Sequence, residues 1–290
     1  MINTLADVPW QACERVDHDG SAGADGQNGR VPLIEVSDAD DPRLDDFRAL
    51  TDADVRPDRR GVVIAEGVNV VARLAGSRYP VRAVLGLPDR VRSLLPLLPP
   101  DVPVYAVDKW VLSDVAGFRV TRGVLASADR LGPLDARTLL IAARHVAVLE
   151  SLNDFENLGA LFRNAAAFGV DAVLLDPHCA DPLYRRSVRV SMGHVLQVPF
   201  AMLPGPWPDS LELLHEDGFE ILALTPDAPA TALRDVAVPQ RWAVLLGAEG
   251  PGLSPAAMAV ADQRVRIPMR PGVDSLNVAT AAAVAFAALT

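Results

Sequence analysis

The sequence predicts an α/β protein whose C-terminal half contains a parallel β-sheet. Short apolar runs alternate with stretches of helical periodicity, which is typical of strand–helix–strand units. A glycine-rich turn at residues 247–252 directly follows the apolar run 242–246, and glycines at a strand end let a ligand approach the backbone. Ligands of open α/β sheets bind at the carboxyl ends of the strands. The length of 290 residues allows two domains.

Residues 1–58 read as an acidic N-terminal extension, with 14 Asp and Glu against 5 Arg. Residues 17–30 lack hydrophobic periodicity and predict a flexible loop. Further on, Leu44, Phe47 and Leu50 are spaced to share one face of a short helix. We therefore expect the extension to be only partly flexible.

Residues 59–126 predict a small α/β domain. Its expected strands are residues 61–65, 81–86, 102–107 and 123–126. Helical patterns lie between them at residues 69–76 and 91–98. Residues 127–138 contain Gly and Pro without apolar periodicity, which predicts a linker.

Residues 139–290 alternate again and predict a larger domain. Its expected strands are residues 139–142 or slightly later, 170–175, 195–200, 219–225, 242–246 and 265–267. Its expected helices are residues 157–168, 184–192 and 211–215, and an Ala-rich segment that follows residue 277. Asp274 or Ser275 can cap this last helix. Because the helix is apolar nearly all round, we expect it to be buried within the protein or against a partner.

Composition excludes several classes of protein. Half of the residues are apolar, but no run is long and unbroken enough to span a bilayer. The first residues form neither the basic nor the apolar region of a secretory signal. Cys13 and Cys179 make neither a disulfide framework nor a zinc pattern. We therefore expect a cytoplasmic protein without a membrane partner and without a metal.

Charge is distributed unevenly along the chain. The net charge of −10 argues against nucleic acid as a partner, yet residues 59–144 carry 13 Arg and Lys against 7 Asp and Glu. A local basic surface is what phosphate contact requires, whatever the total charge. Lys109 is the single lysine, so nearly all positive charge is Arg, which suits bidentate phosphate contact.

Three motifs can carry chemistry. The first runs from Asn157, which can cap its helix, to Arg163 on a mostly apolar helix. That guanidinium needs an acidic or phosphate partner, and a structural ion pair would satisfy it equally well. The second is the turn at 247–252, which matches neither the dinucleotide fingerprint nor a P-loop and is also compatible with an ordinary turn. The third places Ser275 and Asn277 at the start of the last helix.

In this order the motifs resemble a known family. N-x-x-x-x-x-R-N with A-F-G, then G-x-E-G-x-G-L-S, then I-P-M-x-x-x-V-D-S-L-N-V, are similar to the three motifs of the SpoU family. These proteins are S-adenosylmethionine (SAM)-dependent RNA 2′-O-ribose methyltransferases of the SPOUT superfamily. The resemblance covers residues 140–290, and residues 59–126 resemble the family's small substrate-binding domain. Residues 153–156 read NDFE where the family usually has D-P-x before the Asn.

The resemblance implies a SPOUT-type parallel sheet with a deep trefoil knot in residues 139–290. It also implies SAM as methyl donor, no metal, and a homodimer through the C-terminal domain whose active site joins residues of both subunits. The SAM-binding residues that it implies are Leu224, Thr225, Gly247, Glu249, Gly252, Ile267, Met269, Ser275 and Leu276.

The resemblance further implies catalytic roles. Arg163 matches the family's catalytic arginine, and a guanidinium essentially never deprotonates. We therefore expect Arg163 to hold the adjacent phosphate and to stabilise the developing alkoxide, while the phosphate or Glu249 receives the proton. The other predicted site residues are Asn157, Ser275 and Asn277 in catalysis, and Arg189 and Ser191 in RNA binding.

Two other classes compete with this hypothesis. One is a nucleotide-binding α/β enzyme of another type, although a phosphate fingerprint is missing. The other is a non-catalytic RNA-binding protein that keeps the fold, although the motif residues occur together. As substrate we expect structured RNA and favour rRNA over tRNA, because an extra substrate domain indicates recognition at a distance from the methylated ribose.

Overall fold

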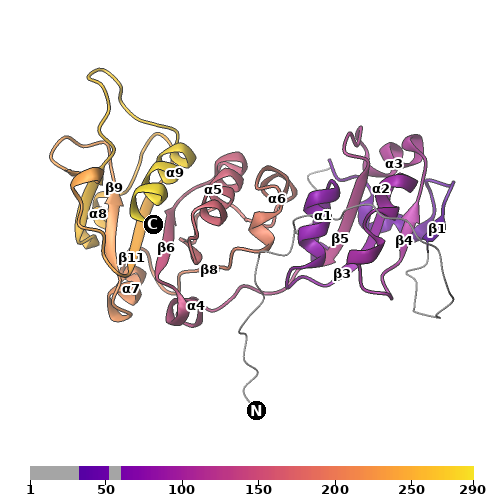
Figure 1. The fold of residues 1–290 in the computed structure, drawn as a ribbon, viewed down its shortest axis with the longest axis horizontal. Coiled ribbons are helices and arrows are strands. Elements are labelled where there is room, and N and C mark those ends of the chain that lie inside the picture. The colour runs from indigo at the N-terminus through magenta and orange to yellow at the C-terminus, as the bar shows by residue number, and fades with distance from the viewer. Residues whose placement is uncertain (1–32, 52–59) are drawn as a thin grey trace, which may run out of the picture. The chain divides into compact units, whose positions relative to one another are not determined.

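The computed structural model describes residues 33–51 and 60–290, which belong to one compact unit of the chain. The loop predicted at residues 17–30 lies outside the described residues. Two β-sheets organise the described chain, a smaller one from its N-terminal part and a larger one from its C-terminal part (Figure 1).

The smaller sheet has five strands in the order β1-β4-β3-β5-β2. They are β1 (Leu33–Glu35), β2 (Val62–Glu66), β3 (Val81–Gly86), β4 (Val104–Ala106) and β5 (Val124–Asp129). β5 runs antiparallel to β2 and β3, whereas β4 is parallel to β1 and β3. The helices that follow β2, β3 and β4 are α1 (Val68–Ala75), α2 (Pro88–Arg92) and α3 (Lys109–Ala116).

The smaller sheet begins earlier in the chain than the predicted residue 59. β1 pairs with β4, and a 3₁₀ helix, Pro42–Phe47, follows it. Leu44, Phe47 and Leu50 are buried in one cluster with side chains of this sheet, as their spacing predicts. Part of the segment assigned to the extension is therefore structural, because its apolar side chains complete this core.

One helical prediction in this part is wrong, and one helix was not predicted. Residues 91–98 do not form one helix, because Pro96 lacks a backbone N–H, and a 3₁₀ turn at Leu95–Leu97 replaces the later turns. The sequence reasoning missed α3. The carboxylate of Asp108 caps this helix by accepting from the backbone N–H of Trp110 and Val111, each at 2.8 Å.

The larger sheet has seven strands in the order β10-β12-β9-β11-β6-β7-β8, and all neighbours are parallel, which confirms the predicted sheet. The strands are β6 (His145–Glu150), β7 (Ala172–Leu175), β8 (Phe200–Met202), β9 (Glu220–Leu224), β10 (Thr231–Ala232), β11 (Trp242–Gly247) and β12 (Gln263–Arg266). The helices of this part are α4 (Ala136–Ala142), α5 (Phe155–Ala167), α6 (Arg185–Val190), α7 (Glu212–Glu216), α8 (Pro255–Val260) and α9 (Val278–Leu289).

Two predicted strands lie later in the chain than their apolar runs. The strand expected at residues 139–142 or slightly later is β6, and only the last residue of the run 195–200 belongs to β8. Residues 139–142 belong to α4, which begins because the Asp135 carboxylate accepts from the Thr138 N–H at 2.8 Å. α4 also shortens the predicted linker of residues 127–138. The run 195–200 begins as a 3₁₀ turn at His194–Leu196, and β8 starts only after Pro199, which has no N–H to donate to a ladder.

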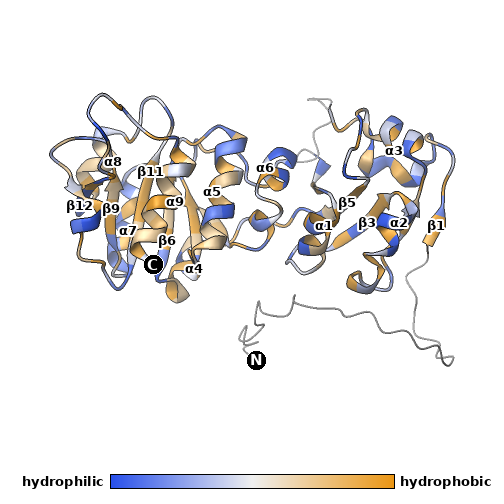
Figure 2. Ribbon diagram, turned by 45° about the horizontal axis from the view of Figure 1, so that its top comes forward, coloured by the Kyte–Doolittle hydropathy of each residue, from blue (hydrophilic) through white to orange (hydrophobic). Residues whose placement is uncertain are grey.

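The core lies on both faces of the larger sheet, whose strands are mostly hydrophobic (Figure 2). Trp242 of β11 is fully buried, its ring stacks on Phe286 of α9, and its indole N–H donates to the Leu289 carbonyl at 3.2 Å. α9 therefore packs against β11 and is largely buried, as its composition predicts. Within the described residues, every helix is too short or too polar to cross a bilayer.

The trefoil knot stays a prediction of the family resemblance. Strand order and register define which strands are neighbours, but they do not show whether a segment passes through a loop.

Candidate functional site

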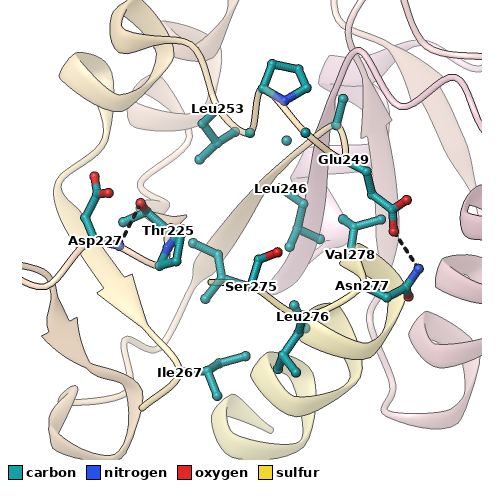
Figure 3. A pocket seen from close by; sticks show the side chains of 18 of the residues that line it. Thr225, Asp227, Leu246, Glu249, Leu253, Ile267, Ser275, Leu276, Asn277 and Val278 are labelled. Atoms are coloured by element: carbon teal, nitrogen blue, oxygen red, sulfur yellow. Dashed lines mark hydrogen bonds between the residues drawn. The ribbon is translucent and has the colours of Figure 1, made fainter. Parts of the chain in front are cut away.

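A cavity of about 580 Å³ opens at the carboxyl ends of β9, β11 and β12 (Figure 3). Its walls are the segments that directly follow these three strands, together with the start of α9. All nine residues predicted to bind the methyl donor line it: Leu224, Thr225, Gly247, Glu249, Gly252, Ile267, Met269, Ser275 and Leu276. The position of the cavity follows from the parallel sheet, because its strand ends meet at one edge.

Gly247 is a position where no side chain fits. A Cβ built there would lie 2.3 Å from the carbonyl carbon of Gly252, which is far inside contact distance. The turn folds back on itself, and the Gly252 N–H donates to the Ala248 carbonyl at 3.0 Å. Gly250 and Gly252 adopt φ of 88° and 69°, which favours glycine. At its glycines the turn thus presents backbone to the cavity.

One carboxamide joins all three sequence motifs. The Nδ2 group of Asn277 donates to Glu249 Oε1 at 2.6 Å and to Asn157 Oδ1 at 2.7 Å. Figure 3 shows the Asn277–Glu249 contact on the side of the cavity where α9 begins. Residues 120 and 28 positions from Asn277 in the chain therefore meet at one point. We call these three side chains the Asn–Glu–Asn network.

The capping residues differ from the prediction. Asn277 itself caps α9, because its Oδ1 accepts from the N–H of Ala279 at 3.0 Å, so neither Asp274 nor Ser275 has this role. Asn157 does not cap α5. The Asp154 carboxylate does so, and Asn157 lies within the first turn. This frees the Asn157 side chain for the network.

Two carboxylates near the cavity were missed by the sequence reasoning. Glu150 ends β6 nearly buried and accepts from the Ser254 N–H at 2.8 Å and from the Trp207 indole at 2.6 Å, so it holds the end of the glycine-rich turn. Asp227 lines the cavity just beyond β9. In the sequence, the only indication of Glu150 and Asp227 is that an acidic residue stands at the end of an apolar run or just after it.

Arg163 lies on the exposed side of α5 and does not line the cavity. Among residues 33–51 and 60–290 it has no ion pair or hydrogen bond from its side chain, so the structural ion pair considered above does not form there. Burial, and then the charges of Arg73 and Arg163, lower the pKa of His194 from its usual 6.5. Among the described residues Arg163 is thus a cation without a partner, and its charge disfavours the protonated form of His194.

The prediction for Ser191 needs correction. Ser191 is fully buried, and its hydroxyl donates to the Val188 carbonyl at 3.0 Å, so it is not available to an RNA phosphate. Arg189 is half-buried, and in the described chain its side chain has no hydrogen bond or ion pair. α6 packs so closely on α5 that a Cβ at Gly159 would lie 2.8 Å from the Ser187 carbonyl oxygen.

Metal ligation has no candidate cluster in the described part of the chain. No group of three or more His, Cys, Asp and Glu side chains is placed there to hold an ion.

Comparison with known proteins identifies the family. A model of the SpoU rRNA Methylase family matches residues 144–287. A tRNA/rRNA methyltransferase of Mycobacterium tuberculosis, named as uncharacterised, is 51% identical over 263 residues, which cover 88% of this chain and 91% of that protein. The chain belongs to the SpoU family. It is therefore an RNA methyltransferase by family.

Two further similarities bear on the fold and on the reaction. The fold of the SpoU chain is similar to the crystal structure of an AdoMet-bound rRNA methyltransferase from Sinorhizobium meliloti, with a TM-score of 0.76 and 23% sequence identity. The match covers 89% of this chain and 97% of the Sinorhizobium chain. It is also 35% identical over 137 residues to the 23S rRNA (guanosine-2′-O-)-methyltransferase RlmB of Bordetella pertussis, covering 47% of this chain and 55% of that enzyme.

Proposed function

We propose that this SpoU protein transfers a methyl group from SAM to a ribose 2′-hydroxyl of structured RNA, with rRNA favoured over tRNA. The observation that carries the proposal is the Asn–Glu–Asn network, which brings the three motifs together beside the cavity. The similarity to a guanosine-2′-O-methyltransferase of 23S rRNA supports both the ribose and the rRNA.

The cavity suits SAM as methyl donor. Its volume falls within the roughly 300–1,000 Å³ of small-molecule sites. Leu246, Ile267 and Leu276 offer apolar walls, Asp227 offers a carboxylate for hydroxyl groups, and the turn at Gly247 brings backbone within reach of a ligand. When bound, SAM supplies an electrophilic methyl group on a sulfonium.

The chain's own residues position the acceptor. Arg163, free of partners in the described structure, is suited to hold the phosphate next to the acceptor ribose and to stabilise the alkoxide that develops. The hydroxyl proton passes to that phosphate or to the Glu249 carboxylate. Asn277 fixes this carboxylate through its donor at 2.6 Å, and Asn157 receives the second hydrogen of the same amide.

We further propose a homodimer through the C-terminal domain. Arg163 does not line the cavity of its own chain, so a shared active site would bring a second copy's arginine to the donor. The outer side of α9 supports this proposal. Thr280, Val284, Ala287 and Ala288 are exposed there without any charge, which is typical of the core of a subunit interface.

SAM binding without a metal is the direct test of the donor site. We expect calorimetry to show one SAM site per chain whose dissociation constant is the same in EDTA. Methyl transfer should also continue in EDTA on RNA that was refolded with its own magnesium controlled. A protein that binds RNA but not SAM would be the non-catalytic alternative, and loss of SAM binding in EDTA would contradict a metal-free site.

Replacing Asn277 tests the network separately from the helix cap. Asn277→Ala removes the cap, so we expect the free energy of unfolding to fall by roughly 0.5–2 kcal/mol. Asn277→Asp keeps a good cap but places a carboxylate where the amide donor meets Glu249. In urea unfolding and SAM calorimetry, the Ala variant should lose both stability and affinity, and the Asp variant mainly affinity. Wild-type affinity in the Asp variant would remove the network from the donor site.

The part of the chain around the smaller sheet is our proposed RNA-recognition domain, with residues 59–126 as its predicted extent. Its support is the local excess of positive charge over residues 59–144 in an otherwise acidic chain.

A further inference from the structure

We propose that one edge of the smaller sheet binds an unpaired segment of the RNA substrate, with the Trp110 ring as a stacking platform. This inference rests on the proposed function and specifies its RNA partner. The edge is defined by topology. β2, β3 and β4 all run in the same direction, and β5 runs opposite, so the carboxyl ends of the first three strands meet the start of β5. We call this the carboxyl edge.

Trp110 is an exposed ring on a rigid support. It is 70% exposed although it stands in the first turn of α3, whose residues Val111 and Leu112 are buried. The Asp108 cap fixes its backbone N–H at 2.8 Å. Within the described chain the ring has no aromatic or cationic partner. Because most of the indole ring is exposed, it contributes little to the core, and it is well suited to stack on a base.

Cations without an ion-pair partner in the described chain lie along the carboxyl edge that carries Trp110. Arg90 lies in the helix after β3, Lys109 directly precedes Trp110, and Arg119 lies just before β5. All three are exposed, and in the described structure none has an ion pair or hydrogen bond from its side chain. The edge therefore carries cations without an ion-pair partner in the described chain, which can contact a phosphate backbone.

The acidic groups of the edge reduce this charge but do not cancel it. Asp89 pairs with Arg92 at 3.4 Å, and the Asp108 carboxylate, which accepts the cap hydrogen bonds of α3, keeps its negative charge beside Lys109. Asp114 stands one helical turn after Trp110 and therefore on the same face of α3. Arg90 and Arg119 still have no carboxylate partner within the described residues, so cations stay in excess.

The carboxyl edge is continuous with the helix next to the catalytic arginine. Arg122 at this edge packs against Gly67, with its Cδ 2.9 Å from where a Cβ would stand. Glu66, nearly buried at the end of β2, pairs with Arg185 of α6 at 3.4 Å. The Arg185 guanidinium lies 4.5 Å from the centre of the Phe118 ring. These contacts fasten α6 to the edge.

From α6 the basic surface reaches the site. Arg189 lies one turn beyond Arg185 on α6, and α6 packs against Gly159 of the helix that carries Arg163. A strand of RNA whose bases stack at Trp110 therefore has cations along its path to Arg163. Stacking requires an open base face, which a regular duplex does not offer. This is why we assign the edge to an unpaired segment rather than to a helix.

The test compares single-stranded and duplex RNA on the full-length protein. The probe is a short fluorescent CA-repeat RNA without secondary structure, alone or annealed to its complement. We expect Trp110→Ala to weaken binding of the single strand by roughly 5- to 150-fold, the range of one lost base stack. Binding of the duplex should change less than about 2-fold, and Trp110→Phe should keep most of the single-strand affinity. Ile141→Ala removes an equally exposed apolar side chain from α4 and should have no effect.

The cations are tested by salt dependence. For the single strand, we plot the logarithm of the affinity against the logarithm of the salt concentration. The triple variant Arg90→Gln, Lys109→Gln and Arg119→Gln should reduce the magnitude of the slope by about 2, because each phosphate contact contributes about 0.7. An unchanged slope, or wild-type single-strand affinity in Trp110→Ala, would overturn the proposal. Equal losses for single strand and duplex would overturn the assignment to an unpaired segment.

Methyl transfer separates this inference from the proposed function. On an RNA that the wild type methylates, Trp110→Ala should raise KM for RNA while kcat and SAM affinity stay the same, because the ring is remote from the donor cavity. If the wild type methylates no RNA, the proposed function fails although the binding results stand. If kcat falls with unchanged KM, Trp110 acts in the reaction and the stacking role is wrong.

Discussion

Arg163→Ala is expected to lower methyl transfer by roughly 10²–10³-fold while SAM affinity stays within a few-fold. The physical reason is the proposed role of Arg163, which serves the acceptor and not the donor. It is exposed, has no ion pair in the described chain, and lies outside the cavity lined by the predicted donor residues. Single-turnover transfer of tritiated methyl and SAM calorimetry measure the two effects separately.

Two comparisons sharpen this result. Arg163→Lys keeps the charge but loses the bidentate fork, so we expect only partial recovery of the rate. Arg137→Ala removes a similarly exposed arginine from α4, where it pairs with Glu216, and should leave the rate unchanged. A loss of SAM binding in Arg163→Ala equal to the loss of rate would show that the arginine belongs to the donor site instead.

The same variant tests whether two subunits share one site. Arg163→Ala has an intact donor cavity, and Gly247→Val has an intact arginine but a side chain that collides with the backbone of the turn at Gly252, which distorts the cavity wall. If the active site joins two chains, mixed dimers of these variants regain activity at one of their two sites. If each chain is complete by itself, the mixture stays inactive, and the proposed shared site is wrong.

A single 2′-deoxy nucleotide at the acceptor position is expected to abolish labelling of the RNA. The proposed reaction forms a bond from the 2′-oxygen to the methyl carbon, and the deoxy nucleotide lacks that oxygen. The position is first mapped by primer extension on methylated rRNA and tRNA. A synthetic fragment is then made with ribose or deoxyribose at that position and offered with tritiated SAM.

The outcomes of this experiment separate the remaining alternatives. Full labelling of the deoxy fragment would show that a base is methylated and that the ribose chemistry is wrong. Labelling of tRNA alone would reverse the preference for rRNA and leave the enzyme class intact. A residual label at another nucleotide would be detected by repeating the mapping on the product.

Sequence patterns were sufficient for the parallel sheet and for the glycine-rich turn at a strand end, whereas the resemblance to the SpoU family supplied the set of residues around the cavity. Apolar runs such as 242–246 are buried on both faces, as in a strand covered by helices on both sides. The glycines at 247, 250 and 252 were also readable, because each meets a local requirement for positive φ or for the absence of a Cβ. Both signals act over a few residues.

Sequence patterns did not predict the local structure where the same residue composition suits two kinds of element. Residues 139–142 and 195–200 are short apolar runs that suit a strand or a helical turn, and the choice depended on an Asp135 cap and on Pro199. Asn157 and Asp154 both suit a helix cap, and the structure selects Asp154. Ser191 has the residue type of a phosphate ligand, but packing between α5 and α6 buries it.

By itself the sequence determined the class of fold, the motif residues and the location of positive charge, since these follow from short-range periodicity and residue type. Only the tertiary structure decided which side chains meet. Asn277 joins Glu249 and Asn157, and Trp110 shares a sheet edge with Arg90, Lys109 and Arg119, because strands distant in the chain end at a common edge. Side-chain contacts depend on which helix covers which strand, and periodicity shows that a face is apolar but not what covers it.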